Sequence, residues 1–330
     1  LIKIKNQVDI DNNIIYANSF TGIIHLMTSE VVIFTHSAPW DFNKFFVNPR
    51  SFHCLTWHGR TIKKIGNHLK VSKLNRFKKI IFPILKERID LTICLHPNEI
   101  NFLETAFSIS PDKIVPTGFP RNDVLVDARI PSNNVLFNKK DEIKVIYVPT
   151  YRNNKDIDDK FEEILENFII DMDNKLLNKF INITLKLHPA QIPSPYILSV
   201  IKKSSVFNIF DSNKSFSNIN LKSYDVLISD YSSIIFDYML LKRPFILFQP
   251  DLDYYKNKDK GFIEDEAVTK LILDSPYQYE TVAEIASKLI DLKNSEFKID
   301  FDELEMIHKN LDNLSSMRLT REIIKRVNGK

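Results

Sequence analysis

Short apolar runs that alternate with helix-like patterns constrain the fold of this chain more than any other feature. Continuous runs of Val, Ile and Leu separated by helices are typical of parallel sheets that helices cover on both faces. The first group of predicted strands is Val31–Phe34, Phe52–Trp57, Leu91–Leu95 and Lys113–Val115. The second group is Lys144–Val148, Ile183–Leu187, Val206–Phe210, Val226–Ile228 and Phe245–Phe248. The pattern therefore predicts an α/β protein with two parallel sheets.

The two groups of strands predict two domains, over residues 1–140 and 141–330. A polar stretch without periodicity, residues 131–142, is the predicted linker. Helical periodicity predicts covering helices over residues 161–180 and 282–292, and a last helix or two over 301–327 that packs back onto the first domain. Two doubly wound domains would hold ligands in the cleft between them, at the carboxyl ends of their strands.

Composition narrows the possible functions. A formal charge of +3 over 330 residues does not indicate a nucleic-acid partner. No apolar run reaches the roughly 18 residues of a membrane-spanning helix, and no signal peptide is expected. With only six glycines, the chain contains neither common Gly-rich phosphate loop. Cys54 and Cys94 lie in predicted strands, which indicates buried thiols in a reducing compartment. A nucleotide would have to be held by side chains and helix ends.

The stretch from Val226 to Asp237 predicts a phosphate site. A short apolar strand ends in the polar elbow Ser229-Asp230-Tyr231-Ser232-Ser233, and an apolar helical pattern follows at once. Such an order places hydroxyl groups and free backbone N–H groups at a helix N-terminus, where anions bind.

Histidine and arginine residues follow three other predicted strands. His58 precedes Gly59, so the backbone can turn there, and the imidazole suits proton transfer near neutral pH. His188 precedes a proline, and Arg152 could fork onto phosphate oxygens. Considered one at a time, each histidine is more simply explained as part of a turn, and the arginine as a surface charge. Their shared position at strand ends, together with the serine elbow, indicates a site.

A basic amphipathic segment runs from Arg60 to Arg88, with ten Lys and Arg residues against one acid, Glu87. An anionic membrane surface or a polyanionic chain would suit this segment, and a solvated helix face is the alternative. The predicted contact residues are Lys70, Lys73, Arg76, Lys78 and Lys79.

No metal site is predicted. The remaining histidines and the cysteines lack metal-ligand spacing, so they are interpreted as core or surface residues. Asp251 and Asp253 follow a predicted strand, where they could bind a cation or cap a helix, and the cap is favoured. No resident cofactor is required by the sequence.

A set of short motifs occurs in order between residues 31 and 261. They are Thr56-Trp57-His58-Gly59 with Lys63-Lys64-Ile65-Gly66, Thr117-Gly118-Phe119-Pro120-Arg121-Asn122-Asp123, Val148-Pro149-Thr150-Tyr151-Arg152, Lys186-Leu187-His188-Pro189, and Ser229-Asp230-Tyr231-Ser232-Ser233-Ile234-Ile235-Phe236-Asp237 with Lys242-Arg243-Pro244. The ordered set resembles the CDP-glycerol glycerophosphotransferase family, the teichoic-acid and capsule polymerases and primases of bacteria. In one departure, Arg60-Thr61-Ile62 follows His-Gly where the family usually has a Thr-Pro pair.

The resemblance implies a GT-B-like pair of Rossmann-type domains, with the donor on the C-terminal one. It implies transfer of a polyol phosphate, glycerol phosphate above all, from CDP-glycerol or CDP-ribitol to a hydroxyl of a polymeric or lipid-linked acceptor, with release of CMP. The family works at the cytoplasmic face of the bacterial membrane, as peripheral proteins.

The resemblance also implies roles for individual residues. His58 looks like the catalytic base, and His188 shares catalysis and donor binding. The other implied donor-side residues are Thr150, Arg152, Ser229, Asp230, Ser232, Ser233 and Asp237. The implied acceptor-side residues are Gly59, Lys63, Lys64, Arg121 and Asp123.

Two other functions remain open on the sequence. A glycosyltransferase that uses a nucleotide-sugar donor would need the same phosphate elbow but would attack carbon. A module that only binds anionic polymer or lipid would need the basic segment and no catalysis. Release of CMP from a CDP-polyol would separate the first interpretation from both.

Overall fold

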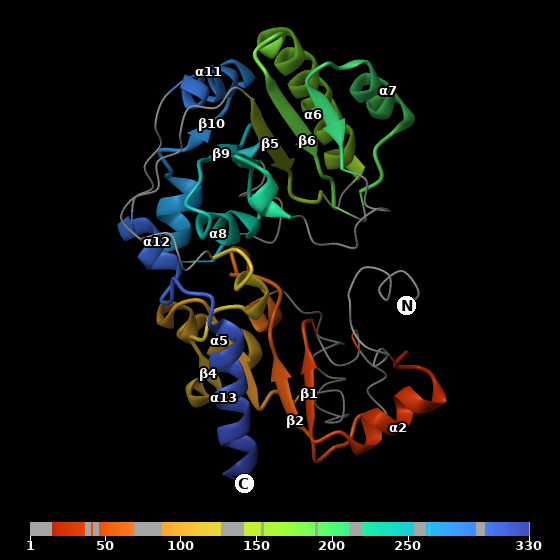
Figure 1. Cartoon of the computed structure of the whole chain (residues 1–330), viewed down its shortest axis with the longest axis vertical. Helices are drawn as coiled ribbons and strands as arrows, with labels where there is room; N and C mark the ends of the chain where they lie inside the picture. The colour runs from red at the N-terminus through yellow and green to blue at the C-terminus, as the bar shows by residue number, and fades with distance from the viewer. Residues whose placement is uncertain are drawn as a thin grey trace. The chain divides into compact units, whose positions relative to one another are not determined.

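The computed structural model describes residues 15–36, 41, 46–68, 88–126, 142–152, 155–188, 191–210, 220–253, 262–263, 265–294 and 301–329. The chain forms two compact units (Figure 1). Unit 1 comprises Leu1–Val124 and Ile307–Lys330, and unit 2 comprises Leu125–Met306. The division near residue 124 differs from the boundary at 140 that the sequence predicts. The predicted linker, except Glu142, lies outside the described residues, as do residues 69–87 of the basic segment.

Unit 1 is built on a four-stranded parallel sheet in the order β1-β2-β3-β4. The strands are β1 (Val31–Phe34), β2 (Phe52–Leu55), β3 (Leu91–Ile93) and β4 (Ile114–Val115). β2 ends two residues earlier than its apolar run predicts. Trp57 adopts a left-handed backbone with φ 54°, which no β-ladder can accommodate. The strand therefore stops just before His58.

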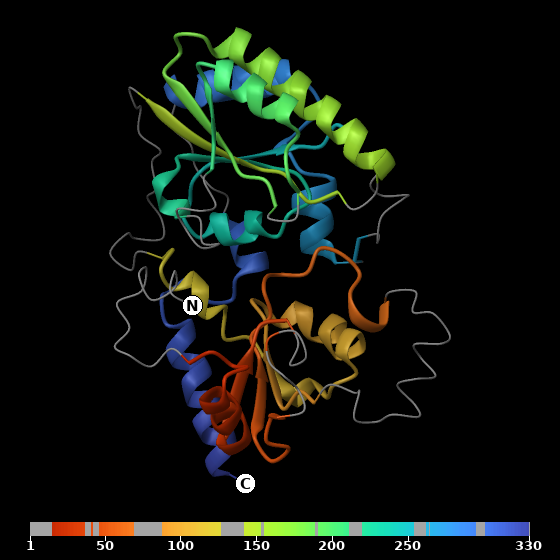
Figure 2. The ribbon, with the colours of Figure 1, turned by 90° about the vertical axis from the view of Figure 1, so that its right-hand side faces the viewer.

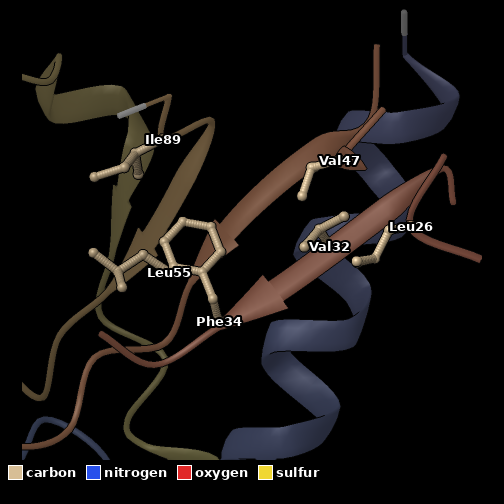
Figure 3. Close-up of a cluster of buried hydrophobic side chains, with 6 residues drawn as sticks. All are labelled: Leu26, Val32, Phe34, Val47, Leu55 and Ile89. Atoms are coloured by element: carbon tan, nitrogen blue, oxygen red, sulfur yellow. The ribbon is translucent and has the colours of Figure 1, made fainter. Parts of the chain in front are cut away.

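Helices α2 (Phe20–Thr28), α5 (Ile100–Phe107) and α13 (Ser315–Asn328) complete unit 1. Figure 3 shows a cluster of buried side chains in unit 1, namely Leu26 of α2, Val32 and Phe34 of β1, Leu55 of β2, and Val47 and Ile89. Partly buried Trp57 packs on the same cluster. The segment that carries His58 is therefore attached to the core of unit 1.

Unit 2 contains a six-stranded parallel sheet in the order β10-β9-β8-β5-β6-β7. The strands are β5 (Ile143–Val148), β6 (Ile181–Leu185), β7 (Phe207–Ile209), β8 (Val226–Ser229), β9 (Phe245–Phe248) and β10 (Gln278–Tyr279). This is the strand order of a Rossmann fold, and the direction of progress reverses between β5 and β8. Ligands bind such sheets at the carboxyl ends of the two strands where the order reverses.

Helices of unit 2 cover its sheet. They are α6 (Lys155–Leu176), α7 (Pro195–Lys203), α8 (Ile234–Met239), α10 (Glu266–Val268), α11 (Val282–Asn294) and α12 (Phe301–Ile307). Figure 2 shows α6 and α7 side by side over the sheet, and α11 also packs on α6. α6 ends before the predicted Phe180, since Asn178 and Phe180 adopt positive φ. Residues 301–327, predicted to form one helix or two, form the two helices α12 and α13.

Short single-turn elements connect these parts. The 3₁₀ helices are η2 (Gly66–His68), η4 (Pro97–Glu99), η5 (Pro111–Lys113), η6 (Pro120–Asn122) and η7 (Leu221–Ser223), and η8 (Thr269–Leu273) is a π-helix. No helix in the described part of the chain is long and apolar enough to cross a membrane. Cys54 and Cys94 are free and buried, as predicted, and burial raises the pKa of Cys54 to about 12. The predicted α/β class with two parallel sheets is confirmed.

Candidate active site

His58 lies in a strained elbow at the carboxyl end of β2. Its neighbour Trp57 holds a positive φ that costs a bulky residue free energy, and such strain persists only where the surroundings enforce it. The indole contacts the His58 ring, with 4.2 Å between centroids, and the Phe107 ring at 5.2 Å. Gly59 is buried behind the elbow, whereas His58 keeps an exposed edge. The imidazole is therefore accessible from solvent.

A second histidine, His36, stacks on His58. Their ring centroids are 4.7 Å apart and their planes differ by 13°. The Asp41 carboxylate holds the turn that carries His36, because Oδ2 accepts hydrogen bonds from the backbone N–H groups of Thr35 (2.6 Å) and His36 (3.1 Å). Sequence reasoning missed both residues. The available signal was that His36 follows β1, which lies next to β2 in the parallel sheet.

The surroundings of His58 favour its neutral form. Burial, helped by the nearby His36 and Arg121, lowers the pKa of His58 to about 4, against smaller raising effects of the Thr35 backbone and Asp41. The imidazole is therefore neutral at pH 7 and can accept a proton.

Arg60, which follows the elbow, is held by contacts with Glu99 and Asn98. Its side chain is buried beside the Glu99 carboxylate, with Nη1 3.4 Å from Oε1, and Nη2 donates to Asn98 Oδ1 at 3.2 Å. Glu99 also accepts hydrogen bonds from the backbone N–H groups of Leu95 and His96. Arg60 thus forms a structural ion pair directly after His58-Gly59.

The structure gives Asp123 a role different from the predicted acceptor contact. Its carboxylate accepts hydrogen bonds from the backbone N–H groups of Ser315 (2.9 Å) and Ser316 (2.8 Å), the first residues of α13. A carboxylate at that position satisfies free N–H groups and complements the helix dipole. Gly118 makes room for this contact, because a Cβ there would lie 2.6 Å from Ser315 Oγ. Asp123 therefore attaches the C-terminal helix to unit 1.

Of the other predicted acceptor-side residues, Gly59 is buried, whereas Arg121, Lys63 and Lys64 reach the surface of unit 1. Arg121 is exposed, lies over the Phe119 ring at 4.9 Å, and is close enough to affect the pKa of His58. Lys64 is exposed and Lys63 is half-buried. The predicted membrane-contact residues lie outside the described residues; they are Lys70, Lys73, Arg76, Lys78 and Lys79.

In unit 2, Asp230 organises the elbow at the carboxyl end of β8. Its carboxylate accepts hydrogen bonds from the backbone N–H groups of Thr150 (2.9 Å) and Tyr231 (2.6 Å), and from the Thr150 hydroxyl. β5 and β8 are paired, with Val148 opposite Ser229. Asp230 thus ties together the two strand ends at which the sheet order reverses, and it orients the elbow.

Arg152 is buried, with 4% of its side chain exposed, between two carboxylates. Nη2 lies 2.8 Å from Asp230 Oδ2 and 3.2 Å from Asp251 Oδ2. The Tyr231 hydroxyl donates to Asp251 Oδ1 at 2.9 Å, and burial with both carboxylates raises the pKa of that tyrosine. Burial by itself lowers the pKa of Arg152, but the carboxylates of Asp230 and Asp251 raise it by more, so the pKa of Arg152 is raised overall.

These contacts give Arg152 and Ser229 partners within the protein. Arg152, which was predicted to fork onto phosphate, pairs with Asp230 and Asp251 in the structure. Ser229 is buried and its hydroxyl donates to the Val148 carbonyl at 2.6 Å, so it too is internal. Asp251 accepts hydrogen bonds from Arg152 and Tyr231. Asp251 follows β9, the neighbour of β8, so its position at a strand end was the available signal.

Ser232 and Ser233, the predicted donor-side serines, are both half-buried at the start of α8, and the Ser233 side chain makes no capping hydrogen bond. Asp237, one turn into α8, is buried.

His188 is exposed beyond the end of β6, with its ring 5.1 Å from that of Tyr151. Partial burial and the nearby Lys186 lower the pKa of His188. Among the described residues, no cluster of three or more His, Cys, Asp or Glu could hold a metal ion.

Comparison with known proteins identifies the family. The model of the CDP-glycerol:poly(glycerophosphate) glycerophosphotransferase family matches residues 3–325. A teichoic acid glycerol-phosphate transferase of Staphylococcus aureus is 29% identical over 252 residues, which are 71% of this chain and 60% of that protein. A teichoic acid poly(glycerol phosphate) polymerase of Bacillus spizizenii is 29% identical over 225 residues, 64% of this chain and 54% of the relative. The chain thus spans less than two thirds of either relative.

Solved structures share the fold. The wall teichoic acid polymerase TagF superposes with a TM-score of 0.63 at 24% identity, over 91% of this chain and 73% of that one. MnaA of S. aureus, solved with UDP, gives a TM-score of 0.51 at 15% identity, over 93% and 78% of the two chains. With the family model matched over nearly all of its length, the chain belongs to the CDP-glycerol:poly(glycerophosphate) glycerophosphotransferase family.

Proposed function

We propose that this protein transfers a polyol phosphate, glycerol phosphate in the first place, from a CDP-activated donor to a hydroxyl of a teichoic-acid-like or capsular polymer. Its family membership and its teichoic acid relatives support the reaction class. The observation that carries the proposal is the neutral, exposed imidazole of His58 at a strained elbow, because the reaction must remove a proton from an alcohol.

In the proposed reaction, His58 accepts the proton of the acceptor hydroxyl while the oxygen forms a bond to the donor phosphorus. The bond from that phosphorus to the CMP oxygen breaks, and CMP leaves with the electron pair. Phosphoryl transfer depends mainly on positioning and on neutralising charge at the leaving group. His58 is thus the general base, and general bases typically contribute about 10²–10⁴-fold.

Unit 2 would bind the donor. Ser232 and Ser233 offer hydroxyl groups and backbone N–H groups to the diphosphate, on an elbow that Asp230 fixes. His188 is exposed, and a diphosphate beside it would favour its charged form despite its lowered pKa. We propose that these groups suffice to stabilise the leaving CMP, so that no resident metal or cofactor is needed.

Release of CMP tests this function. The purified protein should release CMP from CDP-glycerol, or from CDP-ribitol, only when a short polyol-phosphate acceptor is present, with EDTA making little difference. A preparation of His58→Ala, made identically, controls for contaminating hydrolases. If CMP is not released from either donor and UDP is released from a UDP-sugar, a glycosyltransferase replaces the proposal. If no nucleotide is released from any donor and the protein still binds anionic polymer, the protein is a binding module.

We also propose that the protein works peripherally at the cytoplasmic face of the bacterial membrane, through the basic segment. Changing Lys73, Arg76, Lys78 and Lys79 to glutamine should weaken co-sedimentation with phosphatidylglycerol vesicles by more than about tenfold, since each cation near an anionic surface contributes about 1 kcal/mol. The matched control removes four exposed lysines of unit 2, namely Lys175, Lys202, Lys203 and Lys222. If vesicle binding weakens equally in both variants, it depends only on net charge. If it does not weaken in the basic-segment variant, that segment has no role at the membrane.

A further inference from the structure

Helix α5 contacts the segment that carries His58 on both sides of that residue. Before His58, the Trp57 ring packs edge to face on the ring of Phe107, the last residue of α5, with 5.2 Å between centroids. After His58, the Arg60 guanidinium lies beside the carboxylate of Glu99, the residue before α5, with Nη1 3.4 Å from Oε1. His58 therefore lies between two contacts that the opposite ends of one helix provide.

The rest of the segment also follows α5. Asn67 Nδ2 donates to Ser108 Oγ at 2.7 Å and to the Thr105 carbonyl at 3.3 Å. Gly66 has a positive φ of 54°, and it lies so close to α5 that a Cβ there would collide with the Ala106 carbonyl oxygen. The two contacts beside His58 therefore belong to a longer packing surface along this helix.

The Arg60 side chain joins the segment to three acceptors. Arg60 is 1% exposed. Besides the contact with Glu99, its Nη2 donates to Asn98 Oδ1 at 3.2 Å and its Nη1 to the Ile307 carbonyl at 3.4 Å. The guanidinium is planar and carries its donors in a fixed geometry, so these contacts together fix where its backbone lies. A lysine, with one ammonium group on a flexible chain, would not reproduce this fork.

The backbone between His58 and Arg60 needs such a fixed point. Gly59 has a φ of 155°, a conformation that favours glycine, and glycine restricts the backbone less than any other residue. The Trp57 contact fixes the chain only before His58. Without a fixed residue after Gly59, the direction of the imidazole would vary.

We propose that Arg60 is a positioning residue for His58. By holding the backbone that follows Gly59 on the N-terminal end of α5, Arg60 keeps the imidazole against the Trp57 ring in one orientation. Orientation matters to a base, because misplacing a reacting group by about 1 Å can cost about 10²-fold in rate. The effect on rate rests on the proposed function, whereas the orientation of the ring does not.

Histidine NMR tests the orientation without turnover. Histidine is labelled with ¹³C at Cε1 in the full chain, and His58→Gln assigns the signal at neutral pH. The Trp57 and His58 ring centroids are 4.2 Å apart, so the ring current of the indole displaces the His58 proton signal from that of free histidine. In Arg60→Met the signal should move toward the free-histidine position, and in Arg60→Lys it should move part of the way.

A second variant separates positioning from stability. Arg60→Met removes the cation beside the buried Glu99 carboxylate, and such a change destabilises a protein. Adding Glu99→Gln removes the negative charge as well, and the amide oxygen can still accept from the backbone N–H groups of Leu95 and His96. This double variant should unfold at a temperature closer to that of the parent than Arg60→Met does, and it should still show the displaced His58 signal.

The matched control is Arg88→Met. Arg88 Nε lies 3.0 Å from Asp90 Oδ2, in an ion pair just before β3 at the amino ends of the strands, whereas His58 follows the carboxyl end of β2. The control should leave the His58 signal in place. A parental His58 signal in the folded double variant would overturn the proposal, and so would an equal displacement in Arg88→Met.

Kinetics test the effect on rate. In the folded double variant, kcat for acceptor-dependent CMP release should fall by at least about tenfold, while KM for the CDP-polyol stays unchanged because the proposed donor contacts come from unit 2. A displaced signal with a parental kcat would show that the rate does not depend on this orientation, and it would overturn the catalytic part of the proposal. If the parent itself releases no CMP, the proposed function fails and the NMR result alone decides the role of Arg60.

Discussion

Replacing Arg152 with methionine is expected to lower the free energy of unfolding by about 3–5 kcal/mol, the usual cost of removing one partner from a buried ion pair. Asp230 and Asp251 are 2% and 8% exposed, and both accept hydrogen bonds from the guanidinium. Without the arginine, two buried carboxylates face each other with no compensating charge. Urea denaturation at pH 7, followed by far-ultraviolet circular dichroism, measures the loss.

Two further variants locate the cause of that loss. Arg243→Met is the matched control, because the Arg243 guanidinium donates to the backbone carbonyls of Lys222 and Tyr224, so its loss is expected to cost about 1 kcal/mol or less. Adding Asp230→Asn and Asp251→Asn to Arg152→Met should recover part of the stability, because neutral amides bear burial better than unpaired carboxylates. If the triple variant is no more stable than the single one, the network depends on hydrogen-bond geometry and not on charge.

The same network explains why the elbow after β8 could be predicted from the sequence, whereas the partners of Arg152 could not. A strand, small hydroxyl residues and a helix are local features, so the stretch around Ser232 and Ser233 is recognisable on its own. The bond between Arg152 and Asp230 joins residues 78 positions apart in the chain. Only the pairing of β5 with β8 brings them together, and an arginine next to two buried carboxylates is no longer free for phosphate.

The fold shows the same division between local and distant causes. Apolar runs locate the strands of both sheets, because strands buried on both faces have a continuous hydrophobic pattern. Their ends depend on single backbone conformations, as at Trp57, where a left-handed φ ends β2 inside its apolar run. β10 has only two residues, which is too short for any pattern, and is recognisable only by its pairing with β9.

In unit 1, a single sequence motif contains both an exposed residue that is available for a reaction and buried residues that hold the structure together. In the segment from Trp57 to Arg60, His58 is exposed, Trp57 is partly buried against the core, and Gly59 and Arg60 are buried. Asp123 likewise belongs to a family motif but holds α13 in place. Matching a motif therefore identifies the family without saying which of its residues touch the substrate, and burial with hydrogen bonding separates the two groups.

His58→Ala should lower kcat for acceptor-dependent CMP release by about 10²–10⁴-fold, the usual contribution of a general base. KM for the CDP-polyol should change little, because the proposed donor contacts come from unit 2. Thermal unfolding should also change little, since His58 keeps an exposed edge and its removal creates no buried cavity. His25→Ala, an exposed histidine of α2, is the matched control and should retain full activity.

The pH dependence distinguishes a lost base from a disturbed elbow. With a pKa of about 4, His58 stays neutral down to mildly acidic pH and protonates only as the pH falls through that value. The parent should therefore keep its kcat/KM well below pH 6.5, where an ordinary histidine would already be half-protonated. If His58 is the base, the acid limb assigned to it disappears in His58→Ala and the residual rate rises with hydroxide concentration. A variant that keeps the parental limb at a reduced rate would show that His58 only shapes the elbow, and that another group removes the proton.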